Sequence, residues 1–209
     1  MSENESSPKV RQPWSFEMFL RKFFKGIIDP VAAFFLRIGL KPDHITILGF
    51  LLSSLSAYFI ATGKITIGGL ILLIGGPLDV VDGSMARKLG EPSKLGALFD
   101  SVVDRYSEFI VFIGLLIYFL QKPYIMGCIL VIVALGGSLL VSYVKARAES
   151  LGFNAKVGIL TRVERLMIMI IGLIFNIPLV ALWIIAILSN ITAIQRFLFV
   201  RKQALLINK

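Results

Sequence analysis

Residues 79–104 read DVVDGSMARKLGEPSKLGALFDSVVD, and this stretch decides the fold because it sets four aspartates between strongly apolar segments. Asp79 and Asp82 are three residues apart, and Asp100 and Asp104 are four residues apart. On a helix, both spacings put the two carboxylates on one face. If the two helices pack as antiparallel neighbours across the short connection, the four carboxylates converge.

The rest of the chain indicates the medium in which these carboxylates lie. Of its 209 residues, 56% are hydrophobic, and the mean hydropathy of +0.84 is typical of a membrane protein. Apolar segments long enough to cross about 30 Å of hydrocarbon are expected near residues 44–62, 65–86, 96–120, 124–147, 157–176 and 178–200. We therefore predict an all-α integral membrane protein with six transmembrane helices.

The N-terminal region precedes the six-helix transmembrane domain, which we place at residues 41–209. Residues 1–13 are polar and predict a disordered cytoplasmic tail. Residues 14–40 repeat aromatic and aliphatic side chains at helical spacing with basic residues between them. This pattern indicates an amphipathic helix in the membrane interface. We expect it to be interrupted or bent near Asp29 and Pro30.

The basic residues predict the orientation in the membrane. Of the 22 Lys and Arg, only Lys64 and Lys122 fall in the first, third and fifth loops, and the others lie on the side of both termini. The positive-inside rule therefore places both termini and the aspartate stretch at the cytoplasmic face of the cell membrane. A nucleic-acid partner is not expected, because the basic residues are spread over helix ends.

The aspartates have to supply the chemistry together with basic residues, because His44 and Cys128 are the only residues of their kinds. Four carboxylates in a low-dielectric site must be neutralised by protons, basic partners or metal ions. Ligands that are all oxygen favour Mg²⁺ or Mn²⁺ first and Ca²⁺ next. Two such ions would suit a diphosphate substrate, whose oxygens they could bridge.

Small residues accompany the aspartates. Gly83, Ala86, Gly96 and Ala97 allow a ligand or a neighbouring backbone to approach closely, although helix packing alone explains any one of them. Arg87 is a natural contact for a phosphate.

The stretch as a whole follows the pattern D-x-x-D-G-x-x-A-R-x8-G-x3-D-x3-D without a departure. Its fixed positions are Asp79, Asp82, Gly83, Ala86, Arg87, Gly96, Asp100 and Asp104. The pattern resembles the signature of the CDP-alcohol phosphotransferase family of membrane enzymes, also called CDP-alcohol phosphatidyltransferases. Members of that family have an interfacial N-terminal helix and six membrane spans, commonly in a homodimer. The resemblance implies the same fold and assembly here.

The resemblance also implies roles for individual residues. The four aspartates Asp79, Asp82, Asp100 and Asp104 would hold two Mg²⁺ or Mn²⁺ ions on the diphosphate of a CDP-linked lipid. Asp104 would also act as the general base that takes the proton from the acceptor hydroxyl, whose oxygen attacks the phosphorus nearer the lipid and releases CMP. The CDP-donor contacts would be Gly83, Ala86, Arg87, Gly96, Asp43 and Thr46.

The acceptor is indicated by a second group of basic residues at the same membrane face. Candidates for binding an acceptor phosphate are Lys145, Arg147, Arg162, Arg165 and Arg196. Cytoplasmic anchoring is the alternative reading for each of them. The segments SYVKARAESLG at 142–152 and TRVERL at 161–166 are similar to the phosphatidylinositol-phosphate and archaetidylinositol-phosphate synthase branch, whose acceptor is a myo-inositol phosphate.

The predicted function is therefore transfer of a diacylglycerol- or archaeol-phosphate group from a CDP-linked lipid to myo-inositol phosphate, in phospholipid biosynthesis. Glycerol 3-phosphate or another alcohol is the nearest alternative acceptor. Two other classes stay open: a small ion-coupled transporter with intramembrane aspartates, and a membrane prenyltransferase with an aspartate-rich metal site.

Overall fold

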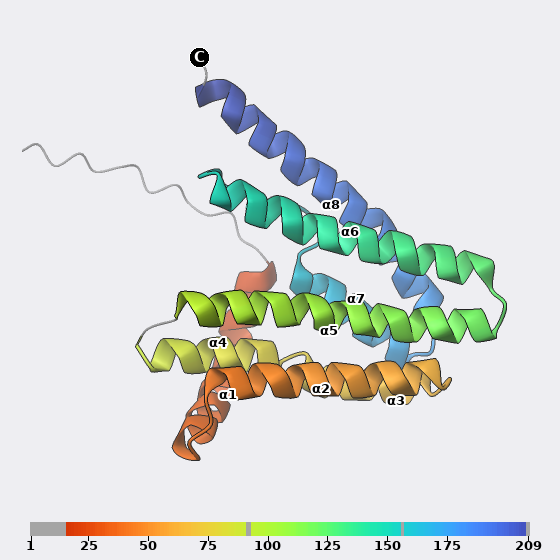
Figure 1. Cartoon of the computed structure of the whole chain (residues 1–209), viewed down its shortest axis with the longest axis horizontal. Helices are drawn as coiled ribbons and strands as arrows, with labels where there is room; N and C mark the ends of the chain where they lie inside the picture. Colours follow the sequence, from red (N-terminus) through yellow and green to blue (C-terminus); the bar gives the residue numbers. More distant parts are fainter. Residues whose placement is uncertain (1–15, 91–92, 156, 208–209) are drawn as a thin grey trace, which may run out of the picture.

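The computed structural model describes residues 16–90, 93–155 and 157–207, so the predicted tail at 1–13 lies outside the described residues. All regular secondary structure in the described part is helical, and Figure 1 shows its arrangement. The helices are α1 (Phe16–Arg37), α2 (Pro42–Ala61), α3 (Ile65–Gly75), α4 (Leu78–Lys88), α5 (Lys94–Gln121), α6 (Ile125–Ser150), α7 (Arg162–Ile174) and α8 (Pro178–Ile207).

Helices α2 to α8 form one bundle, in which the chain reverses direction after α2, α4, α5, α6 and α7 (Figure 1). Helix α2 packs against α3, α4 and α5, while α8 packs against α6 and α7. The turns after α2, α5 and α7 lie together at one end of the bundle (Figure 1). The core contains side chains of α3, α5, α7 and α8, of which Leu115, Leu173 and Leu182 are completely buried. The start of α5, which carries Asp100 and Asp104, lies at the opposite end of the bundle (Figure 1).

Two glycines allow close approach of the helices that surround the aspartates. A Cβ added to Gly114 of α5 would lie 2.6 Å from the carbonyl oxygen of Ala57 on α2, and one added to Gly69 of α3 would lie 2.8 Å from the backbone nitrogen of Ile174 on α7. Neither position has room for a side chain. The spacing of α5 from α2, and of α7 from α3, therefore depends on these glycines.

The predicted second span, 65–86, consists of two helices. Helix α3 ends at Gly75 and α4 begins at Leu78, with Gly76 and Pro77 between them. Pro77 has no backbone N–H to donate to the preceding turn, and its ring disfavours a continuous helix. A new helix thus begins immediately before Asp79.

Four segments among the described residues are long and apolar enough to cross a membrane: Pro42–Ala61, Ile65–Lys88, Ile125–Ser150 and Pro178–Leu206. Many of their apolar side chains are exposed, such as Ile74, Ile125 and Ile132. Such extensive apolar surface is that of an integral membrane protein.

The other two predicted spans differ from these four. Helix α5 has 28 residues but carries charged side chains such as Arg105 and Glu108 near its middle. Helix α7 has 13 residues because it begins at Arg162, and the predicted start at 157 is wrong. The chain before α7 is a loop, in which the backbone nitrogen of Leu160 donates to Thr192 Oγ1 of α8 at 3.1 Å.

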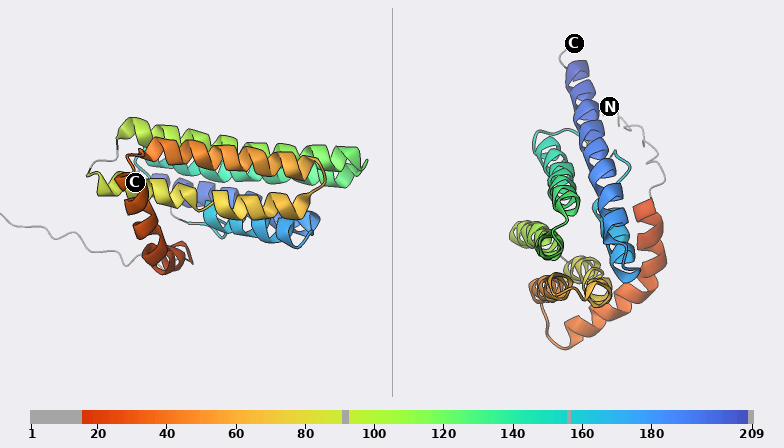
Figure 2. Two further views of the ribbon diagram at one scale, coloured as in Figure 1. Left: turned by 90° about the horizontal axis from the view of Figure 1, so that it is seen from below. Right: turned by 90° about the vertical axis from the view of Figure 1, so that its right-hand side faces the viewer.

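Helix α1 occupies most of the segment predicted to be amphipathic. It continues through Pro30 as one helix, so the helix is not interrupted there, and it changes direction along its length (Figure 2). Ile28 and Ala32 of α1 pack in a small core with Val81 and Met85 of α4. Helix α1 thus supports the helix that carries the first two aspartates.

Candidate active site

The four aspartates come from two helices at one end of the bundle. Asp79 and Asp82 lie on α4, whereas Asp100 and Asp104 lie near the start of α5. Helices α4 and α5 pack mainly against α2 rather than against each other, so the expected direct packing of the two helices is replaced by packing through α2. Thr46 of α2 donates a hydrogen bond to Asp82 Oδ2 at 2.6 Å.

Three of the carboxylates are arranged as a cation site. Asp79, Asp82 and Asp100 each offer an oxygen, and these oxygens lie within 4.8 Å of one another. Within the described part of the chain, the buried Asp100 Oδ1 has no hydrogen-bond partner. Burying such an oxygen is costly unless a donor or a cation contacts it. Because the available ligands are all oxygen, the residues present fit a hard divalent cation such as Mg²⁺ or Mn²⁺.

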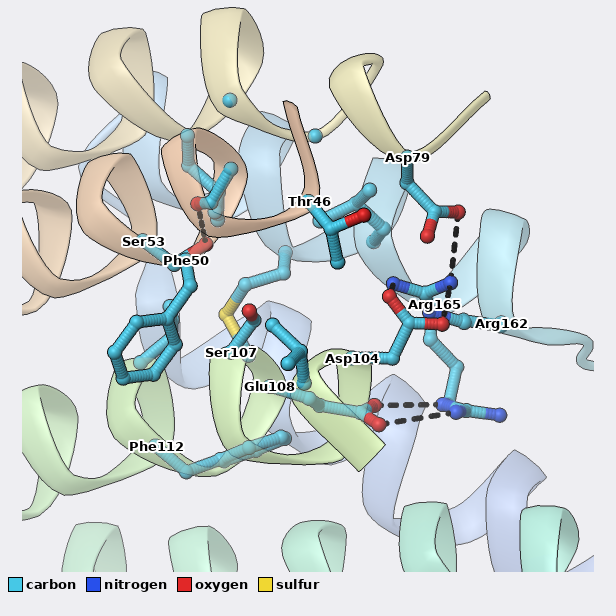
Figure 3. Close-up of a pocket in the computed structure, with 18 of the residues that line it drawn as sticks. Thr46, Phe50, Ser53, Asp79, Asp104, Ser107, Glu108, Phe112, Arg162 and Arg165 are labelled. Atoms are coloured by element: carbon cyan, nitrogen blue, oxygen red, sulfur yellow. Dashed lines mark hydrogen bonds and ion pairs between the residues drawn. The ribbon is translucent and has the colours of Figure 1, made fainter. Parts of the chain in front are cut away.

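Arg162, the first residue of α7, joins the carboxylates of the two aspartate helices. Its Nη1 lies 2.7 Å from Asp79 Oδ2, and its guanidinium also forms an ion pair with both oxygens of Asp104 (Figure 3). Asp104 is only 8% exposed. The guanidinium therefore supplies positive charge next to the carboxylates.

A second arginine of α7 makes a parallel contact with α5. Arg165 Nε donates to Glu108 Oε1 at 3.0 Å, and its Nη2 donates to Glu108 Oε2 at 3.3 Å. Glu108 is not among the site residues predicted from the sequence. The signal was present, since Glu108 continues the four-residue spacing of Asp100 and Asp104 along one face of α5.

These groups line a cavity that contains about 730 Å³ of space not filled by atoms, part of it open to the surroundings. The polar lining residues include Thr46, Asp79, Asp82, Asp104, Glu108, Arg162 and Arg165. The apolar lining residues include Leu72 and Met169. Phe50 and Phe112 also line the cavity (Figure 3). The cavity thus joins a charged region, suited to phosphates and a cation, to an apolar region inside the bundle.

The residues predicted to contact the CDP donor divide into two groups. Thr46 lines the cavity, whereas Asp43, Gly83, Ala86, Arg87 and Gly96 lie on the neighbouring surfaces of α2, α4 and α5 and are not lining residues. Gly96 lies beside Asp43, because a Cβ added to it would be 3.9 Å from Asp43 Oδ1. Among the described residues, a Cβ added to Gly83 would meet only Arg87 Nη1, at 3.5 Å. The described part of the chain therefore leaves this surface uncrowded at Gly83.

The residues predicted to bind the acceptor phosphate also form two groups, one inside the cavity and one outside it. Arg162 and Arg165 line the cavity, whereas Lys145, Arg147 and Arg196 do not. Lys145 and Arg147 are exposed on α6. Arg196 is buried, and it donates to the backbone oxygens of Val157 and Val141, each at 2.8 Å. Its contacts link α8 to α6 and to the loop before α7.

The chain is similar in sequence to one known family of enzymes. The family model for CDP-alcohol phosphatidyltransferase matches residues 40–195. The archaetidylinositol phosphate synthase of Methanothermobacter thermautotrophicus is 36% identical over 186 residues, which cover 86% of this chain and 91% of that protein. The phosphatidylinositol phosphate synthase of Streptomyces avermitilis is 35% identical over 202 residues, which cover 89% of this chain and 82% of that protein.

A solved structure agrees with these sequence matches. The crystal structure of Mycobacterium tuberculosis phosphatidylinositol phosphate synthase (PgsA1) with CDP-DAG bound is similar to this chain, with a TM-score of 0.76 and 34% identity. The match covers 83% of this chain and 93% of that one. A second structure of the same protein, in complex with manganese and citrate, matches with a TM-score of 0.75. The aspartate signature, the helical fold and these matches together establish that the chain belongs to the CDP-alcohol phosphatidyltransferase family.

Proposed function

We propose that this enzyme transfers a phosphatidyl-type group from a CDP-linked lipid to a hydroxyl of myo-inositol phosphate and releases CMP. The observation that carries the proposal is one cavity lined by Asp79, Asp82 and Asp104 together with the two arginines of α7. Asp100 lies beside this lining, because its carboxylate clusters with those of Asp79 and Asp82. The names of the relatives support the choice of acceptor, and the donor's lipid is a diacylglycerol or an archaeol. Glycerol 3-phosphate is the alternative acceptor of the same chemical class.

Asp79, Asp82 and Asp100 would hold the divalent metal, with Asp104 completing the set for a second ion. Bound Mg²⁺ or Mn²⁺ would bridge the donor's diphosphate oxygens and offset the negative charge that develops during transfer. Thr46 fixes the orientation of the Asp82 carboxylate through its 2.6 Å hydrogen bond, as a supporting residue commonly does for a metal ligand.

We assign the general-base role to Asp104. Its carboxylate takes the proton of the acceptor hydroxyl, the hydroxyl oxygen forms a bond to the phosphorus nearer the lipid, and the bond from that phosphorus to the oxygen of CMP breaks. Asp104 is nearly buried and paired with Arg162, so the proton acceptor is held in place inside the cavity. To accept the proton, this carboxylate must give up part of its interaction with Arg162.

We place the cytidine and diphosphate of the donor along the surface formed by Asp43, Gly83, Ala86, Arg87 and Gly96, next to Thr46. The absence of crowding at Gly83 supports this placement, as does the position of Gly96 beside Asp43. Arg87 is exposed at the end of α4, where its guanidinium can reach a phosphate.

For the acceptor phosphate we assign the primary contacts to Arg162 and Arg165, which line the cavity. Lys145 and Arg147 would attract the anionic acceptor to the mouth of the site. Arg196 would act through the loop that it holds against α6.

In the membrane we propose six crossings, by α2, by α3 with α4, and by each of α5, α6, α7 and α8, with α1 in the interface. Both termini and the site would face the cytoplasm, because Lys64 and Lys122 are the basic residues at the opposite end of the bundle. The assembly would be a homodimer in the cell membrane.

The proposal is tested by incubating the purified protein in detergent with Mg²⁺ or Mn²⁺, a CDP-linked lipid and separate phosphorylated or plain polyols. Mass spectrometry should identify a phosphatidylinositol phosphate-type lipid together with an equal amount of CMP. An ion-coupled transporter would release no CMP. A larger yield with glycerol 3-phosphate than with myo-inositol phosphate would favour the alternative acceptor.

A further inference from the structure

Glu108 and Arg165 form a contact that the aspartate signature does not include. Arg165 is 2% exposed, and it uses Nε and Nη2 to donate to the two oxygens of Glu108. Its Nη1 is buried and has no hydrogen-bond partner in the described part of the chain. A buried charged donor without an acceptor is costly, so this edge of the guanidinium is suited to an anionic ligand.

The contact crosses the cavity. Helices α5 and α7 are not among the pairs that pack closely, and both helices contribute lining residues. The side chains of Arg162 and Arg165 lie on one face of α7, and they reach Asp104 and Glu108 on one face of α5 (Figure 3). Two parallel ion pairs therefore connect the helices on either side of the cavity.

The two arginines differ in their acidic partners and in how much of each guanidinium these partners occupy. The guanidinium of Arg162 is committed to Asp79 and Asp104, which belong to the aspartate signature. Arg165 is instead paired with Glu108, which lies outside the signature, and this pairing uses only one edge of its guanidinium. Without Glu108, the nearest acidic side chain on the same face of α5 would be Asp104, one helical turn earlier.

We propose that Glu108 is a positioning residue for the acceptor. It fixes the guanidinium of Arg165 so that Nη1 is presented to the acceptor phosphate, and it keeps Arg165 from pairing with Asp104. This inference rests on the proposed function, in which Arg165 binds the acceptor phosphate and Asp104 takes the proton. A bidentate contact suits this purpose because it fixes the plane of the guanidinium as well as its position.

The experiment compares Glu108→Gln with wild type in detergent, using a CDP-linked lipid, Mn²⁺, and myo-inositol phosphate and glycerol 3-phosphate as separate acceptors. Glu149→Gln is the matched control, because it makes the same change of charge at an exposed position on α6. The expected result for Glu108→Gln is an acceptor KM raised by about 10-fold or more, the scale seen when a supporting partner is removed. The KM for the CDP-lipid and the Mn²⁺ affinity should stay near wild type.

A double-mutant cycle makes the test specific to Arg165. In the Arg165→Gln background, Glu108→Gln should raise the acceptor KM by less than about 2-fold, because there is no guanidinium left to position. Glu108→Asp, which keeps the charge, should restore part of the acceptor affinity. Equal effects of Glu108→Gln in both backgrounds would overturn the proposal, as would a fall in kcat with an unchanged acceptor KM.

Two further outcomes separate the possible failures. If Glu108→Gln does not fold, the cycle is carried out with Glu108→Asp, and additive effects of Glu108→Asp and Arg165→Gln would overturn the positioning role. If wild-type protein uses an unphosphorylated polyol as well as its phosphate, the phosphate-binding part of the proposed function is wrong, and the role of Glu108 falls with it. If wild-type protein requires the phosphate and Glu108→Gln has no effect on the acceptor KM, only the present inference is wrong.

Discussion

Arg162 Nη1 lies 2.7 Å from Asp79 Oδ2, and the same guanidinium contacts Asp104, so an arginine of α7 is bound directly to two of the four signature aspartates. A divalent cation held by these aspartates would be repelled by the guanidinium at this distance. Arg162 and the metal are therefore expected to compete for the same carboxylate oxygens. Metal binding is therefore expected to weaken the ion pair between Arg162 and Asp104.

The first prediction follows from this competition. Arg162→Gln should bind Mn²⁺ about 3- to 10-fold more tightly than wild type, because the competing positive charge is gone. The Arg162 side chain is about one-third exposed, so solvent screening keeps the effect moderate. Titration of Mn²⁺ followed by electron paramagnetic resonance measures the affinity directly, with Arg201→Gln as the control at an exposed position. Weaker Mn²⁺ binding by Arg162→Gln would show that the arginine supports the metal site instead.

The second prediction concerns the metal ligands. Activity should require Mg²⁺ or Mn²⁺ and should collapse in Asp79→Asn, Asp82→Asn and Asp100→Asn, because each change removes a charged oxygen from a site without softer ligands. CMP release is the measurement, before and after exhaustive treatment with EDTA and after adding Mn²⁺ back. Full turnover in EDTA would rule out metal dependence.

The third prediction separates chemistry from binding. Asp104→Asn should keep measurable affinity for the CDP-lipid while losing a factor of about 10² to 10⁴ in turnover, the usual contribution of a positioned base. The three carboxylates that remain clustered can still hold a cation. Donor binding by calorimetry and single-turnover rates test the two parts separately. A variant with a rate near wild type would assign the base role to another group.

The fourth prediction tests the residue behind Asp82. Thr46→Val keeps the shape of the side chain but removes the 2.6 Å hydrogen bond to Asp82 Oδ2, so Mn²⁺ affinity should fall by about 10-fold. Thr46→Ser keeps a hydroxyl and should bind Mn²⁺ more nearly as wild type does. The same titration of Mn²⁺ serves for both variants. If Thr46→Val and wild type bind Mn²⁺ with equal affinity, Thr46 does not support the metal site. Its predicted role would then be limited to contact with the CDP-linked lipid.

The helices could be predicted from the sequence where an apolar run is bounded by turn residues. Helices α2 and α6 begin and end within a few residues of the predicted spans at 44–62 and 124–147. The break between α3 and α4 was missed because Gly76 and Pro77 lie inside a continuous apolar run. The late start of α7 was missed because residues 157–160 are apolar or glycine, although a contact with Thr192 of α8 holds Leu160 in a loop.

The site, like the fold, contains some residues that could be predicted from the sequence and others that could not. The signature gives the aspartates because their spacing on two helices defines a shared face. Glu108 lies one turn beyond the signature and was not identified, although it shares the face of Asp104. Charge and position along the chain placed five basic residues at one end of the bundle, but they could not show that Lys145 is exposed while Arg165 is buried. That difference depends on how α6 and α7 are rotated by packing.

The last prediction concerns the acceptor. Arg165→Gln should raise the KM for the phosphorylated acceptor by about 10- to 150-fold, since a hydrogen bond to a charged group contributes about 1.5–3 kcal/mol. The affinity for the CDP-lipid should change little. Arg165 is the first choice among the basic residues because it is buried, lines the cavity and has an unpartnered Nη1 in the described part of the chain.

The controls for this prediction are Arg201→Gln and Lys202→Gln near the end of α8, where both side chains are exposed. They should matter little, because exposed charges contribute small and salt-screened energies. Unphosphorylated myo-inositol should be a poor acceptor, because the arginines in the cavity would be left without the phosphate that balances their charge. If myo-inositol is used as well as its phosphate, or if Arg165→Gln alters neither the acceptor KM nor kcat/KM, the arginines of α7 do not bind an acceptor phosphate. Their role would then be to pair with Asp104 and Glu108 across the cavity.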